Sequence, residues 1–318
     1  MGAPVRRARA VRRPALAIAA AALLLPGVAL CAATHTLIVS GLGGEPEYER
    51  RFREQATALA AAARKMSGDP SLVTTLIGSQ ARADAVREAL RSLAEKVGED
   101  DDVLVVLIGH GSFDGEEYRF NLPGPDLTGS QWAALFDALP ARRQLIVNAT
   151  SASGAVAERW RKDNRVVITA TKSGGERTAT RFAEYWIEAA TTPAADLDKD
   201  EVVTAAEAFE YASNKVAESF KSAVLLATEH ARLEGAGADR FPVARFGVAA
   251  IRTTDPALKA MLAERIGIER ELAAIRERRD ALGEEAYYDE LEATLVRLAR
   301  LQRRIDAHQV AAPTPGGT

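Results

Sequence analysis

Two short segments combine residue types that could carry out chemistry on a bound substrate. His110 and Gly111 follow the most hydrophobic stretch of the chain, residues 102–108, and Ser151 stands 41 residues beyond the histidine. An imidazole can exchange protons near neutral pH, and a serine can attack a carbonyl once a base takes its proton. The glycine N–H can bind the oxyanion that then develops. The structural alternative is a histidine without a catalytic role and a serine, Ser151 or Ser153, that caps a helix beginning near residue 155.

A third segment, residues 196–207, has the spacing of a calcium-binding loop. Oxygen ligands are expected at its positions 1, 3, 5, 7 and 12, which are Asp196, Asp198, Asp200, the carbonyl of Val202, and Glu207. Hard oxygen ligands at this EF-hand spacing favour a structural Ca²⁺. Position 6, where glycine would allow the sharp turn, is Glu201. The alternative is that Thr204 and Glu207 form a capping box at a helix start and that the aspartates are only solvated.

The elements that must position these segments alternate between strand and helix. Expected strands cover residues 36–40, 71–77, 102–108, 144–148 and 165–169, and expected helices cover 47–66, 81–97, 131–139, 155–162 and 177–190. Parallel strands need helical crossovers, so this succession predicts an α/β fold with a mainly parallel sheet covered by helices on both faces. Ligands bind such sheets beyond the carboxyl ends of the strands, where His110 and Ser151 are expected to lie side by side. Residues 196–233 are expected to be mostly helical, and residues 245–251 to form a late strand.

The segments around His110 and Ser151 resemble the caspase/legumain-type cysteine peptidase superfamily, and most closely bacterial legumain-like proteins. The resemblance spans residues 36–221 and rests on His110-Gly111, on residues 150–154 (Thr-Ser-Ala-Ser-Gly) and on residues 169–175 (Thr-Ala-Thr-Lys-Ser-Gly-Gly). It implies a caspase-like sheet and a peptide or protein ligand. It places the family's catalytic histidine on His110, its oxyanion glycine on Gly111 and its cysteine nucleophile on Ser151.

Serine in place of the family's cysteine changes the chemistry that the resemblance implies. A thiol with a pKa near 8.5 ionises readily beside a histidine, whereas a serine depends on a histidine held in place by a third group. No acid is assigned that role, and Asp114 is the nearest one in sequence. Three hypotheses follow: a peptide-binding pseudo-peptidase that cleaves weakly or not at all, an active serine hydrolase with His110 as base and Ser151 as nucleophile, and a calcium-stiffened interaction protein.

The first 33 residues have the pattern of an export signal. A basic head is followed by the uncharged apolar stretch 15–25, and Cys31, Ala32 and Ala33 are small residues that offer a cleavage site. The basic residues of the head are Arg6, Arg7, Arg9, Arg12 and Arg13. We therefore expect a periplasmic or secreted protein with no transmembrane span after cleavage. The alternatives are a retained N-terminal anchor and a lipid anchor on Cys31.

Composition limits the remaining function classes. The chain has 318 residues, 47% hydrophobic and 27% charged, which is enough apolar material for a large core. Its single cysteine excludes an internal disulfide. Five of its 41 basic residues lie in the export signal, so 36 remain against 44 acidic residues and the formal charge falls from -3 to -8. No nucleic-acid partner is expected for such a chain, because its basic residues are also dispersed.

Residues 254–310 predict an antiparallel helical hairpin after the α/β domain of residues 34–253. Apolar residues recur every seven positions, with two more in intermediate positions, and Gly283 separates the halves. They are Met261, Ile268, Ile275, Leu282, Leu291, Leu298 and Ile305, with Leu272 and Leu295 between them. The hairpin could pack on its own domain or serve for self-association. Residues 311–318 are expected to form a disordered tail.

Overall fold

The computed structural model describes residues 33–251, 253 and 255–311. The predicted export signal lies outside the described residues except for Ala33. The predicted tail does too, except for Ala311.

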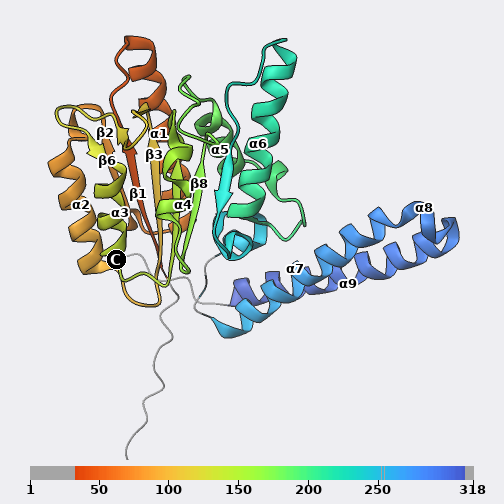
Figure 1. Cartoon of the computed structure of the whole chain (residues 1–318). Coiled ribbons are helices and arrows are strands. Elements are labelled where there is room, and N and C mark those ends of the chain that lie inside the picture. The colour runs from red at the N-terminus through yellow and green to blue at the C-terminus, as the bar shows by residue number, and fades with distance from the viewer. Residues whose placement is uncertain (1–32, 252, 254, 312–318) are drawn as a thin grey trace, which may run out of the picture. The chain divides into compact units, whose positions relative to one another are not determined.

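The centre of the α/β domain is a six-stranded sheet with the order β10-β8-β7-β3-β1-β2 (Figure 1). Its strands are β1 (Thr34–Ser40), β2 (Val73–Ile77), β3 (Asp102–Ile108), β7 (Arg143–Asn148), β8 (Arg165–Thr169) and β10 (Arg232–Glu234). Neighbouring strands are parallel, except that β10 runs antiparallel to β8. Strand β3 is buried along its whole length, as an unbroken apolar stretch predicts. The expected mainly parallel sheet is confirmed.

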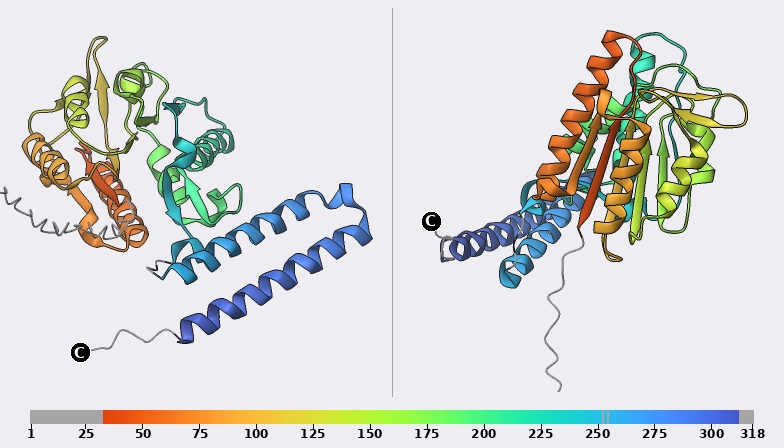
Figure 2. Two further views of the ribbon diagram at one scale, coloured as in Figure 1. Left: turned by 90° about the horizontal axis from the view of Figure 1, so that it is seen from below. Right: turned by 90° about the vertical axis from the view of Figure 1, so that its left-hand side faces the viewer.

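Helices cover both faces of this sheet, which Figure 2 shows from two sides. They are α1 (Pro46–Ser67), α2 (Ala83–Lys96), α3 (Gly129–Asp137), α4 (Ala157–Trp160), α5 (Phe182–Thr191) and α6 (Ala205–Ser222). One core layer joins α1, α5 and α6 to strand residues such as Val106 and Val147, and the other joins α2, α3 and α4 to Val105 and Ile146. Successive strand residues face opposite sides, so β3 and β7 contribute to both layers.

Several short elements differ from the sequence prediction. Strands β4 (Gly111–Phe113), β5 (Tyr118–Phe120) and β6 (Leu127–Thr128) form an unpredicted antiparallel sheet directly after His110. Helix α6 ends at Ser222, and residues 225–231 form neither helix nor strand before β10 begins. Helices α4 and α5 are shorter than predicted, because the loops after β7 and β8 extend further along the chain.

The late strand predicted over residues 245–251 is wrong. Strand β11 (Pro242–Arg245) ends where the prediction begins, and Gly247–Ala250 forms a 3-10 turn with Gly247 at φ 46°. A positive φ takes the backbone out of the extended conformation, so the strand cannot continue. β11 pairs with β9 (Val202–Thr204) in a separate two-stranded sheet and not with the main sheet.

The C-terminal helices form the predicted antiparallel hairpin. They are α7 (Pro256–Glu277), α8 (Arg279–Leu282) and α9 (Glu284–Ala311), and Gly283 at φ 76° separates the last two. Ion pairs between α7 or its C-cap and α9 match the antiparallel register. They join Glu264 to Arg304, Glu271 to Arg297, and Arg278 to Glu290. The hairpin core contains Leu258, Leu262, Ile268, Leu301 and Ile305. Leu295, which the heptad pattern assigned to the seam, is 43% exposed. Within the described ranges, no helix is long and apolar enough to cross a membrane.

Candidate functional site

The carboxyl ends of β3 and β7 bring Gly111 and Ser151 together. The two strands are parallel neighbours in which Leu107 lies opposite Asn148. Ser151 is 2% exposed, and its Oγ accepts a hydrogen bond from the Gly111 N–H (3.2 Å) and donates one to the Gly111 carbonyl (3.1 Å). The hydroxyl is therefore satisfied by one glycine, whose N–H is the predicted oxyanion donor.

The His110 ring packs against α1. Its centroid lies 4.9 Å from that of Tyr48 and 5.1 Å from that of Phe52, with both pairs in edge-to-face geometry. Burial lowers the pKa of His110, a backbone hydrogen bond with Gly43 partly offsets this effect, and the nearby Arg51 guanidinium lowers the pKa further. A neutral imidazole of this kind can accept a proton. However, no hydrogen bond in the described part of the chain joins His110 to Ser151 or to a carboxylate.

Asp114, the acid nearest to His110 in sequence, has other partners. It forms an ion pair with Arg119 across the β4–β5 turn and accepts hydrogen bonds from the N–H groups of Glu116 and Glu117. The hydrogen bond from Arg119 and these backbone contacts hold the pKa of Asp114 well below its ordinary value. Asp114 is therefore a turn-stabilising residue and does not orient the histidine.

The turn that carries Ser151 is held by the loop after β8. Ala152 has a left-handed backbone conformation (φ 57°), and its N–H donates to the carbonyl of Glu176 at 2.7 Å. Thr171 Oγ1 accepts from the Gly154 N–H at 2.8 Å, and the Thr171 N–H donates to Ser153 Oγ at 3.2 Å. The first helical turns after Ser151 have no side-chain cap, so neither Ser151 nor Ser153 caps a helix here. The hydrogen bonds to the loop after β8 hold this turn instead.

A buried hydrogen-bond network lies beneath the same turn. Tyr118 Oη and Thr150 Oγ1 are 2.6 Å apart, and Thr150 Oγ1 donates to Asn148 Oδ1 at 2.8 Å. Burial strongly raises the pKa of Tyr118, so the phenol stays protonated. The network fixes the chain on both sides of Ala149 and was not predicted, because Tyr118 belongs to a strand of three residues with no clear sequence signal.

A second group of polar residues, also not predicted, lies behind the Ser151 turn. The Glu176 carboxylate lies 2.5 Å from His230 Nδ1 and accepts from the His230 N–H at 3.2 Å. Glu229, which precedes His230 in the chain, is 3% exposed. Its carboxylate accepts hydrogen bonds from the N–H groups of Arg181 (2.7 Å) and Phe182 (2.8 Å) at the start of α5. Burial raises the pKa of Glu229 to about 7. These contacts join segments that are far apart in sequence, and residue spacing carries no signal for them.

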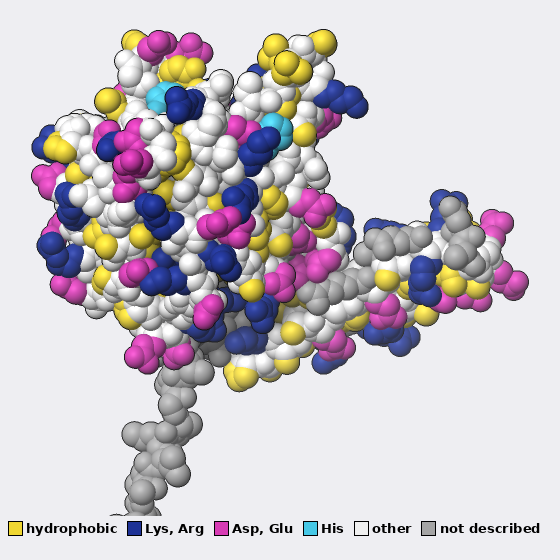
Figure 3. Space-filling view, in the orientation of Figure 1, with side chains coloured by type: hydrophobic (Ala, Val, Ile, Leu, Met, Phe, Trp, Pro, Cys, Tyr) yellow, Lys and Arg dark blue, Asp and Glu magenta, His cyan; other side chains and the backbone are white. Residues whose placement is uncertain are grey.

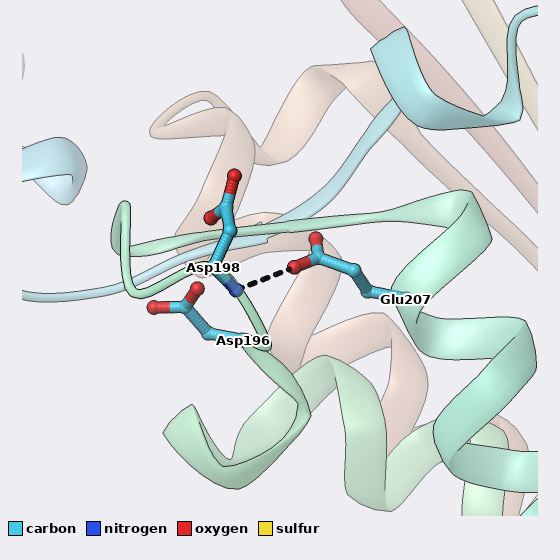
Figure 4. A group of neighbouring side chains, drawn as sticks. All are labelled: Asp196, Asp198 and Glu207. Atoms are coloured by element: carbon cyan, nitrogen blue, oxygen red, sulfur yellow. Dashed lines mark hydrogen bonds between the residues drawn. The ribbon is translucent and has the colours of Figure 1, made fainter. Parts of the chain in front are cut away.

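The acidic loop brings three of its predicted ligand side chains together (Figure 4). Carboxylate oxygens of Asp196, Asp198 and Glu207 all lie within 4.8 Å of one another. Ca²⁺ takes oxygen ligands at 2.3–2.6 Å, so one ion between these groups can reach all of them. Asp200 lies outside this cluster, and its Oδ1 accepts from the Val202 N–H at 2.7 Å.

The backbone of the acidic loop also has the turn that the calcium interpretation requires. Glu201, at position 6, has φ 64°, the left-handed conformation for which glycine is usual. Burial raises the pKa of Asp196, which is the expected direction for a carboxylate taken out of water beside other acids. The capping box of Thr204 and Glu207 is present as well, so the two interpretations of this loop coexist in one geometry.

The surface around these sites carries mixed charge. On the face shown in Figure 3, Lys and Arg side chains alternate with Asp and Glu side chains. Two apolar side chains that follow α6 are almost fully exposed, Val224 (91%) and Leu226 (90%).

Comparisons with known proteins give structural similarity alone. No family model and no curated protein matches the sequence. A crystal structure of protein GSU0716 from Geobacter sulfurreducens is similar with a TM-score of 0.44 and 14% identity, over 71% of this chain and 96% of that chain. Caspase-1 from Spodoptera frugiperda is similar with a TM-score of 0.46 and 11% identity, over 64% of this chain and 86% of that chain. Scores below 0.5 do not establish a relationship.

Proposed function

We propose that this protein is a caspase/legumain-like pseudo-peptidase that binds a peptide or protein ligand and cleaves it weakly or not at all. The observation that carries the proposal is the reciprocal hydrogen bonding between Ser151 and Gly111, with the His110 ring packed on α1. The residues that resemble the family's nucleophile and oxyanion glycine are adjacent, but among the described residues no hydrogen bond joins the base to the nucleophile. This arrangement supports a site that keeps the family's residue positions without the hydrogen bond that would relay a proton from the serine to the histidine.

The chemistry of serine supports the same conclusion. A hydroxyl attacks a peptide carbonyl only when a base lies within hydrogen-bond reach and is itself held by a third group. His110 forms no hydrogen bond or ion pair with a carboxylate among the described residues, and the Ser151 proton is donated to the Gly111 carbonyl. A bound peptide carbonyl could still accept from the Gly111 N–H if the serine hydroxyl moved aside. Binding therefore needs fewer changes than cleavage.

A phosphonate probe together with a peptide-binding assay tests the proposal. We expect no covalent labelling of the wild-type protein. We expect saturable binding of a library peptide that weakens in His110→Ala and strengthens in Ser151→Ala, because loss of the serine hydroxyl frees the Gly111 N–H for a peptide carbonyl. Ser112→Ala, which alters an exposed serine on the adjacent strand β4, is the matched control and should leave binding unchanged. Labelling of the wild type that is lost in both site variants would establish the serine hydrolase instead.

The acidic loop is proposed to hold a structural Ca²⁺. The clustered oxygens of Asp196, Asp198 and Glu207 and the left-handed turn at Glu201 support this assignment. Bound there, the ion would neutralise the acid cluster, of which Asp196 is buried, and stiffen the connection between α5 and α6. Chelation should lower the melting temperature of the wild type and not that of Asp198→Ala. Asp239→Ala removes an aspartate that is 74% exposed and should respond to chelator as the wild type does. Equal melting temperatures of the wild type with and without chelator would contradict the proposed Ca²⁺ site.

Export and self-association complete the proposal. An export signal over residues 1–33 predicts that the mature protein begins near residue 34, which N-terminal sequencing of the exported protein checks. Self-association through the hairpin is supported by apolar side chains that α9 leaves exposed, at Tyr288, Leu295 and Val296. Sedimentation of the full chain should then show a dimer or larger species that Leu295→Glu disrupts. A monomeric wild type would leave the hairpin without this role.

A further inference from the structure

We propose that Glu176 and His230 are positioning residues that keep Ser151 in its closed orientation, with its hydroxyl on the Gly111 N–H. The inference rests on the proposed peptide-binding function of the same site, because release of that N–H is what a ligand carbonyl requires. It assigns His230 as the surface-accessible member of the pair, through which the occupancy of the cleft is regulated.

The backbone at Ala152, directly after Ser151, is held in place by Glu176. Ala152 is fully buried and holds φ 57°, a left-handed conformation that is unfavourable for a residue other than glycine. Such a conformation persists only where the surroundings fix it. The contact that fixes the Ala152 N–H is the carbonyl of Glu176, at 2.7 Å. The direction in which the preceding residue, Ser151, presents its hydroxyl therefore depends on where the Glu176 backbone lies.

The Glu176 side chain in turn holds the Glu176 backbone in place. One carboxylate oxygen accepts from the N–H of Lys172 (2.9 Å) and the N–H of His230 (3.2 Å), and the other lies 2.5 Å from His230 Nδ1. The Lys172 Nζ adds an ion pair at 3.6 Å. The carboxylate is largely buried, at 12% side-chain exposure, so a lost partner is poorly replaced by water. Glu176 thus connects the Ser151 turn to the segment that carries His230.

The His230 side chain reaches the surface of the protein. Its side chain is 47% exposed although its Nδ1 faces Glu176. The residue before it, Glu229, accepts hydrogen bonds from the N–H groups of Arg181 and Phe182 at the start of α5. The backbone at His230 is therefore held in place. A ligand or partner that contacts the exposed side of this imidazole can draw it away from Glu176. The Glu176 carbonyl would then loosen its hold on Ala152, and the Gly111 N–H would become free for a peptide carbonyl.

A single-thiol reporter tests this coupling without relying on peptidase activity. Cys31 is the one cysteine of the chain, so the full-length double variant Cys31→Ala/Ser151→Cys carries its only thiol at the site. The thiol is buried with Ser151 and reacts with a maleimide only when the turn opens. Introducing His230→Ala into this double variant should raise the rate of maleimide labelling by about tenfold, which is the effect of losing one charge-assisted hydrogen bond. His230→Asn places an amide N–H where Nδ1 stood and should restore the rate to within about twofold of the parent, since it replaces the same bond.

The control separates positioning from general loosening of the domain. Tyr211→Phe removes a 2.5 Å hydrogen bond between α6 and Glu188 of α5, away from the Ser151 turn, and should leave the labelling rate unchanged. Glu176→Gln retains the backbone carbonyl while weakening the contact with His230, and should lie between the parent and His230→Ala. An unchanged rate in His230→Ala, or an equal rise in Tyr211→Phe, would overturn the inference. Failure of the parent protein to bind any peptide would contradict the proposed function alone, because thiol labelling reports the turn itself.

Discussion

Glu229 gives the protein a pH-dependent stability that can be worked out from its contacts. Its side chain lies in an almost fully buried position, where the carboxylate accepts two N–H groups at the start of α5. The loss of hydration outweighs these two bonds and the attraction of Arg181, so its pKa rises from 4.5 to about 7. Replacing it with glutamine keeps the shape and a carbonyl acceptor but removes the titration.

The sign and size of the effect follow from linkage. Below pH 4.5 the carboxyl is protonated in both the folded and the unfolded chain, and its contribution to stability is complete. Between pH 4.5 and about 7 the folded protein retains a proton that the unfolded chain releases, so the free energy of unfolding decreases as pH rises. Each pH unit of this window is worth about 1.4 kcal/mol, which gives a total loss of about 3 kcal/mol.

Urea unfolding of the wild type and Glu229→Gln, at about pH 5 and about pH 8, measures this loss. The wild-type free energy of unfolding should fall relative to that of Glu229→Gln by about 2.5 kcal/mol between the two conditions, because a small part of the loss already occurs below pH 5. Glu218→Gln, at an exposed position of α6, should follow the wild type. A difference between wild type and Glu229→Gln that stays constant, or that grows in favour of the wild type as pH rises, would refute the reasoning.

Three further substitutions probe the turn and the hairpin. Gly154→Ala should lower the melting temperature and cost about 1–3 kcal/mol, because its Cβ would lie 2.2 Å from the Ser173 N; an unchanged melting point would show that the loop moves freely. Tyr118→Phe should cost about 1–2 kcal/mol in urea unfolding by removing the partner of Thr150, and a neutral effect would mean that the network is not formed. Leu301→Ala should destabilise the hairpin by about 2–5 kcal/mol, seen as faster hydrogen exchange in α7 and α9, and no change there would place Leu301 outside the core.

The parts of the fold that the sequence predicted are those set by local pattern. The unbroken apolar stretch 102–108 has no polar face, so it could only be a strand covered on both sides. The parallel alternation then placed Gly111 and Ser151 at one edge of the sheet, because neighbouring parallel strands end together. The spacing of the acidic loop likewise placed Asp196, Asp198 and Glu207 in one cluster.

The parts that were missed depend on tertiary partners. Strands β4 to β6 have two or three residues each, too few for a periodic signal. The packing of His110 on Tyr48 and Phe52 depends on the angle at which α1 crosses the sheet, which residue types do not specify. The heptad pattern likewise could not show that Leu295 faces water, because the helix pair uses a narrower apolar seam than the sequence offers.

The loop between β8 and α5 has a consequence for how this site can change in evolution. The backbone of the sheet decides where Ser151 lies, but the hydrogen bonds that hold the turn around Ser151 come from Thr171, Glu176 and Thr180, all within that one loop. Location and direction of the hydroxyl are therefore encoded in separate stretches of chain. A few exchanges within a dozen consecutive residues could turn the hydroxyl toward or away from the imidazole while the scaffold stays intact, so gain and loss of catalysis in such proteins need not disturb folding.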